Sequence, residues 1–243
     1  MAAPRSDARR AFLGNAGKIG LMVGGGMAIS TAAALVGSAQ ANEMPRTGRS
    51  GEEVNPPETL MREHGVLSRI LLIYEAGLRK FDAGEDFDSS PIANAARIVR
   101  EYIEDYHERL EEEVVFPRFK RTGRLLALIN VLSDQHRAGR RLTDIVLQTA
   151  LTGRKDADDR QRLVRAMQSF IAMSRPHTAR EDTVLLPMLK DLFTPGEYED
   201  LAAKLESSGR RYFVGSRFDG VVQQVASFEI AMGVNDLTQY TRP

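Results

Sequence analysis

Two stretches of the sequence repeat one pattern, HERLEEEVVFP (107–117) and HTAREDTVLLP (177–187). In each stretch a glutamate follows the histidine after four residues and a proline follows it after ten. Residues i and i+4 lie one turn apart on the same face of an α-helix. His107 with Glu111, and His177 with Glu181, therefore each direct an imidazole and a carboxylate toward one point.

The region around these stretches shows helical periodicity, with apolar residues recurring every three or four positions. The pattern predicts four helices, at residues 58–83, 91–119, 124–152 and 158–192. Each carries one histidine on its apolar face: His64, His107, His136 and His177. The connections are short, so consecutive helices should run antiparallel. We therefore expect an all-α fold, an up-down-up-down four-helix bundle with no strand. The separations of 72 residues from His64 to His136 and 70 from His107 to His177 indicate two related helix hairpins.

Composition excludes several functions. The chain has 243 residues, no cysteine and equal numbers (33) of basic and acidic residues. The lack of cysteine rules out disulfides, thiolate metal sites, iron–sulfur ligation and a cysteine nucleophile. The zero net charge argues against a nucleic-acid partner, which would require a basic surface.

The buried faces of the four helices together offer six candidate ligands: His64, His107, Glu111, His136, His177 and Glu181. Buried carboxylates without partners are unfavourable, and two metal ions would supply partners for all six side chains. A mixture of imidazole and carboxylate suits iron, manganese or zinc, whereas magnesium and calcium prefer oxygen ligands alone. Two bridging carboxylates with histidines at either end favour a pair of non-haem iron ions.

In these six residues the chain resembles the haemerythrin-like (HHE cation-binding) domain over about residues 57–192. Ferritin-like bundles place the carboxylate before the histidine, in the order Glu-x-x-His, and here the order is reversed. The resemblance implies two oxo- or hydroxo-bridged non-haem iron ions that bind or sense O2 or NO, or a protein that stores iron. Two alternatives remain open: a di-iron oxidoreductase acting on peroxide or NO, and a structural bundle held by zinc or manganese.

One position departs from the oxygen-carrying members of that family, and a second leaves the choice of ligand open. Arg140 stands one turn after His136, where the carriers have a further histidine, and an arginine cannot ligate a metal. The carriers end in an aspartate five residues after the last histidine. Asp182 occupies that position, and we prefer Glu181 as the ligand because it mirrors Glu111. We expect Glu108, Glu112 and Glu113 to be solvated or to lie behind the ligands.

Four regions follow from these patterns. Residues 1–41 resemble a twin-arginine export signal: Arg9 and Arg10 precede a weakly apolar run that ends in AQA (39–41). Residues 42–57 are expected to be a linker, 58–192 the bundle, and 193–243 a C-terminal helical extension. The extension begins at a capping box formed by Thr194 and Glu197. This organisation predicts a periplasmic or otherwise exported protein with no stable membrane span after cleavage, and the alternative for residues 1–41 is an uncleaved N-terminal anchor.

The export route can be tested by replacing Arg9 and Arg10 together with lysine. If the twin-arginine pair sets the route, the variant stays in the cytoplasm at the size of the uncleaved precursor, as seen by fractionation and immunoblotting. Normal export of this variant would point to the general secretory route.

Overall fold

The computed structural model describes residues 55–212 and 217–241. All regular secondary structure in these two ranges is helical. The predicted signal, residues 1–41, lies outside the described residues, as does most of the predicted linker. Among the residues that the structure describes, no helix is both long and apolar enough to cross a bilayer.

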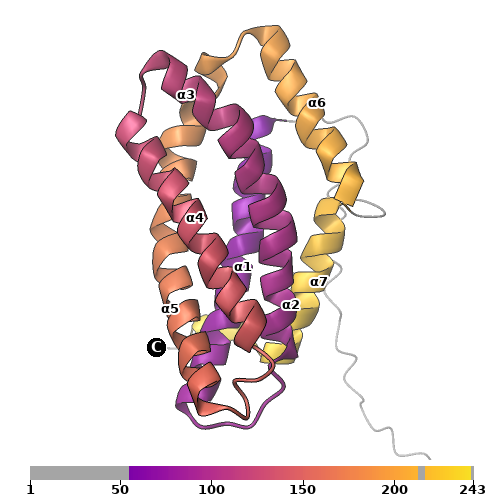
Figure 1. The fold of residues 1–243 in the computed structure, drawn as a ribbon. Helices are drawn as coiled ribbons and strands as arrows, with labels where there is room; N and C mark the ends of the chain where they lie inside the picture. The colour runs from indigo at the N-terminus through magenta and orange to yellow at the C-terminus, as the bar shows by residue number, and fades with distance from the viewer. Residues whose placement is uncertain (1–54, 213–216, 242–243) are drawn as a thin grey trace, which may run out of the picture. The chain divides into compact units, whose positions relative to one another are not determined.

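Four antiparallel helical runs form the bundle that the periodicity predicts (Figure 1). Helix α1 is the first run and α4 the third. The second run passes from α2 through two π-helical segments, η1 and η2, into α3. The fourth passes from α5 through the π-helical segment η3 into two short 3-10 turns. Their bounds are α1 Pro56–Asp82, α2 Ser90–Ile98, η1 Val99–Glu108, η2 Glu111–Val115, α3 Phe116–Thr122, α4 Leu126–Thr149, α5 Ala157–Arg180, η3 Glu181–Leu185, η4 Leu186–Met188 and η5 Lys190–Leu192.

The predicted boundaries need two corrections. Helix α1 begins at Pro56, inside the expected linker, because proline is well accommodated in the first turn of a helix. The second and fourth runs are also not uniform α-helices, since the π-helical segments η2 and η3 interrupt them within the repeated pattern and η1 precedes it in the second run.

The prolines of the repeated pattern account for the widened turns of η2 and η3. Segment η2 ends just before the residue preceding Pro117, and η3 ends likewise before Pro187. A proline inside a helix has no N–H to donate to the carbonyl four residues earlier, and its ring crowds that carbonyl. The backbone relieves this by widening its turn, as in the π-bulges found at many functional sites.

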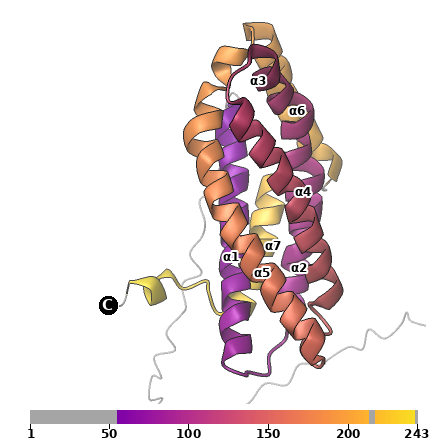
Figure 2. The ribbon, with the colours of Figure 1, turned by 60° about the vertical axis from the view of Figure 1, so that its left-hand side comes forward.

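The C-terminal extension folds against the bundle. Helix α6 (Pro195–Tyr212) begins at the predicted capping box, where Glu197 accepts a hydrogen bond from the Thr194 backbone at 3.0 Å. Helix α7 (Arg217–Met232) packs against α1 and α2, as Figures 1 and 2 both show, and a short turn, η6 (Leu237–Tyr240), follows it.

An ion pair joins α7 to α1. Arg69 donates from Nε to Glu229 at 2.8 Å and from a second nitrogen to the other carboxylate oxygen. Glu229 is buried. The sequence alone gave no position for this helix.

Replacing Arg69 with methionine tests this contact. The variant leaves the buried Glu229 carboxylate without its partner, so we expect unfolding in urea to show a loss of about 2 kcal/mol. The matched control is Lys80→Met, which removes a more exposed ion pair with Glu85 and should change stability by less than about 0.5 kcal/mol. Equal effects of the two variants would show that the Arg69–Glu229 pair does not hold α7 on the bundle.

Candidate metal centre

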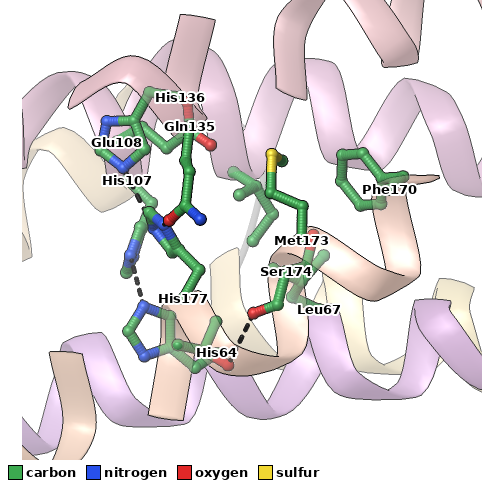
Figure 3. Close-up of a pocket in the computed structure, with 12 residues that line it drawn as sticks. His64, Leu67, His107, Glu108, Gln135, His136, Phe170, Met173, Ser174 and His177 are labelled. Atoms are coloured by element: carbon green, nitrogen blue, oxygen red, sulfur yellow. Dashed lines mark hydrogen bonds between the residues drawn. The ribbon is translucent and has the colours of Figure 1, made fainter. Parts of the chain in front are cut away.

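The four histidine rings meet inside the bundle and form two pairs. The Nε2 atoms of His64 and His107 lie 2.9 Å apart, and those of His136 and His177 lie 3.3 Å apart. All four side chains are almost completely buried. Figure 3 shows the rings gathered at one end of a small cavity. Each of the four main helical runs thus contributes one inward-facing imidazole.

Two carboxylates lie between the histidine pairs. Glu111 is 3.7 Å from the Nε2 of His107 through one oxygen and 3.6 Å from that of His136 through the other. Oε2 of Glu181 is 3.3 Å from the Nε2 of His64 and 3.1 Å from that of His177. Both glutamates are fully buried, and none of their four carboxylate oxygens makes a hydrogen bond. Each carboxylate therefore reaches both pairs from a position where burial is unfavourable without a cation.

The second nitrogen of each histidine ring, Nδ1, forms a hydrogen bond with an oxygen of a residue outside the six candidate ligands. His64 Nδ1 lies 2.6 Å from Asp182, and His107 Nδ1 lies 2.7 Å from Glu63. His136 Nδ1 lies 3.0 Å from Glu112, and His177 Nδ1 lies 2.9 Å from the side-chain oxygen of Gln135. Ionised carboxylates and amide oxygens only accept hydrogen bonds, so these partners place the ring hydrogen on Nδ1.

With Nδ1 protonated, a neutral ring directs the lone pair of Nε2 inward. Two such lone pairs face one another within each histidine pair, and the unpaired oxygens of Glu111 and Glu181 face them as well. This arrangement is unfavourable unless positive charge lies among these atoms. Metal-binding histidines ordinarily show the same arrangement, in which one ring nitrogen donates a hydrogen bond and the other is available to bind the metal.

The pKa values at the site reflect the same concentration of negative groups. Burial lowers the pKa of His64, but the Asp182 and Glu181 carboxylates outweigh burial and raise it to about 9. Burial raises the pKa of Glu111 well above its ordinary value, and the charge of Glu181 adds to that rise. Burial also opposes the charge of Glu181, but the imidazoles of His177 and His64 outweigh it and lower its pKa. A proton on His64 therefore adds positive charge beside Glu181 and Asp182, whereas burial lowers the pKa of His107 and of His136.

Comparison with known proteins agrees with this geometry. The family model described as "Hemerythrin HHE cation binding domain" matches residues 55–189, more than half of the chain. The chain belongs to the haemerythrin HHE cation-binding family. Uncharacterized proteins of Mycobacterium tuberculosis and Mycobacterium bovis are 40% identical to it over 221 residues, covering 87% of this chain and 87% of each relative. No solved structure gives a significant match.

Arg140, one turn after His136, contacts two acidic side chains beside the site. Its guanidinium lies 2.9 Å from Glu112 and 3.1 Å from Glu108. Glu108, Glu112 and His136 form a third group of side chains close enough to hold a cation. The guanidinium of Arg140 already supplies a positive charge there. Glu108 is mostly buried and lies close to His136, which fits the expected alternative of a residue behind the ligands, and its burial raises its pKa well above the ordinary value.

A small cavity adjoins the histidines. Its volume is about 20 Å³, enough for a molecule the size of water, for which about 10–15 Å³ suffices. Figure 3 shows the imidazoles at one end and Leu67, Phe170 and Met173 at the other. Only a very small molecule fits beside the rings in this structure.

The structure brings all six predicted ligand candidates together, with His64, His107 and Glu111 in one potential metal-binding group and His136, His177 and Glu181 in another. Asp182, the alternative to Glu181, instead contacts the outer face of His64. Sequence reasoning missed the roles of Glu63 and Gln135. The available signal was position, since each directly precedes a histidine in the first and third helices.

The Arg140 contact can be tested in metal-free protein. Arg140→Met leaves the buried Glu108 without its cation, so we expect a loss of about 2 kcal/mol in urea unfolding. The control is Arg137→Met, on the same helix, which removes only an exposed pair with Asp134 and should change stability by less than about 0.5 kcal/mol. Similar values for both variants would mean that Arg140 does not compensate the buried charge.

Proposed function

We propose that this haemerythrin-family chain holds two non-haem iron ions and uses them to bind or sense a small ligand, O2 or NO, or to store iron. His64 and His107 would ligate one ion, and His136 and His177 the other. Glu111 and Glu181 would bridge the two ions.

One observation carries the proposal: four buried carboxylate oxygens, on Glu111 and Glu181, have no hydrogen-bond partner. Buried polar atoms in folded proteins are almost always paired, and such exceptions call for an explanation such as an ion. Each glutamate also lies within 4 Å of a histidine from both pairs. A single ion could use only part of this donor set, whereas two ions would use all of it.

The donor set supports iron. It consists of imidazoles and carboxylates without thiolates, which suits iron, with manganese and zinc as the alternatives to test. Bound iron would supply ligand binding and one-electron redox chemistry at this position. The protein's own contribution is to fix the imidazoles through their Nδ1 atoms and to exclude bulk water.

The cavity limits the ligand to a very small molecule. Its apolar wall of Leu67, Phe170 and Met173 suits a diatomic molecule or peroxide. Arg140 favours a second candidate function, a peroxide or NO oxidoreductase, because one fewer protein ligand leaves a coordination position open. Steady consumption of peroxide or NO by the iron-loaded protein would support the enzyme, and tight binding without turnover would support the carrier or sensor.

We further propose that the protein works outside the cytoplasm. The support is the sequence of residues 1–41, in which Arg9 and Arg10 precede a weakly apolar run and a small-x-small site.

Anaerobic loading with Fe(II) tests the two-ion site. The wild type should bind close to two ions per chain, measured by metal analysis after desalting. Glu181→Ala should lose both ions, because this carboxylate is proposed to contact both. Asp182→Ala should keep two ions with about 10- to 100-fold weaker affinity, because Asp182 only holds a ligand from outside.

A wild-type ratio of one, or selective binding of calcium or magnesium, would contradict the di-iron site. Retention of both ions by Glu181→Ala, together with their loss from Asp182→Ala, would instead make Asp182 the bridge.

A further inference from the structure

The two halves of the site repeat each other in sequence and in contacts, but not in charge. Glu63 directly precedes His64 and accepts from His107, and Gln135 directly precedes His136 and accepts from His177. The positions are equivalent and the distances similar, 2.7 and 2.9 Å. One position holds a carboxylate and the other a neutral amide.

A second difference lies one turn after these histidines. Arg140 follows His136 by four residues, and the residue that follows His64 by four is the exposed Ser68. Arg140 lies 2.9 Å from Oε1 of Glu112, the same atom that accepts from His136. The counterpart of Glu112 is Asp182. Within the described ranges no lysine or arginine forms an ion pair with Asp182 or with Glu63.

The charge carried by the groups around the Nδ1 atoms therefore differs between the two histidine pairs. Glu63 and Asp182 put two uncompensated negative charges behind His107 and His64. Behind His136 and His177 lie the uncharged Gln135 and the carboxylates of Glu112 and Glu108, to which Arg140 supplies one positive charge, so less negative charge remains here than behind the first pair. A carboxylate behind an imidazole makes the ring a stronger donor, and negative charge nearby attracts a cation. The bridging glutamates reach both pairs and do not offset this difference.

We propose that the two ion positions are unequal. The position at His64 and His107 fills first and binds more tightly, and the position at His136 and His177 fills second and exchanges more readily. This inference rests on the proposed two-ion function. Loss of such outer partners ordinarily weakens metal binding about 10- to 100-fold, so we expect the two dissociation constants to differ by at least tenfold.

The NMR signals of the histidine rings can report the order in which the two ion positions fill. The chain has only four, and all four lie at the site. In metal-free full-length protein labelled with ¹⁵N-histidine, each ring can be assigned by a single His→Gln variant. Zn(II), a diamagnetic probe, is then added stepwise. The first equivalent should shift the Nε2 signals of His64 and His107, and the second those of His136 and His177.

Substitutions at Glu63 and Gln135 test whether these outer partners cause the difference in affinity. Gln135→Glu should tighten the second step about tenfold or more, and Glu63→Gln should weaken the first step by a similar factor, measured by calorimetry with Zn(II). The matched control is Glu113→Gln, which removes one exposed charge near Glu112 without contact to a histidine and should leave both steps within about twofold.

Simultaneous shifts of all four rings, or initial binding at His136 and His177, would overturn the inference. It would also fail if the exchanged variants bound like the wild type. A total other than two ions would instead contradict the proposed function, so the two failures are distinguishable.

Discussion

The carboxylates of Glu111 and Glu181 lie inside a helical bundle with no hydrogen bond to any of their oxygens. Burying an uncompensated carboxylate is strongly unfavourable, and these two also repel each other. Four imidazoles surround them with their Nε2 atoms directed inward. The fold is therefore stable at this point only if positive charge lies among the six side chains, as protons or as metal ions.

The repeated pattern meets the requirement with two consecutive acidic residues. They follow each histidine by four and five positions, and the widened turns before Pro117 and Pro187 begin at the first of them. The first, Glu111 or Glu181, lies between the histidine pairs. The second, Glu112 or Asp182, reaches the outer nitrogen of a histidine on another helix. One short pattern thus supplies both a candidate ligand and the group that orients another candidate ligand.

Much of the fold was predictable because the sequence is strongly periodic. The spacing of apolar residues gave the four helices and their antiparallel order, and the histidines marked the interior faces. The repeated pattern identified the six residues that the structure brings together.

The parts that could not be predicted depend on contacts between distant segments. No local pattern pairs Gln135 with His177, or Arg69 with Glu229, because each contact is formed only when separate helices pack. The π-helical turns were missed because 3.6-residue periodicity was applied across the whole pattern. Glu108 looks like an ordinary surface glutamate until Arg140 is seen to compensate its burial.

The central claim is that two iron ions bind between the histidine pairs. Anomalous diffraction at the iron edge, from crystals of the Fe(II)-loaded full chain, tests it most directly. Two peaks about 3.5–4 Å apart, one beside His64 and His107 and the other beside His136 and His177, are the predicted result. A single peak, or peaks at Glu108 and Glu112 instead of at the four rings, would contradict the claim.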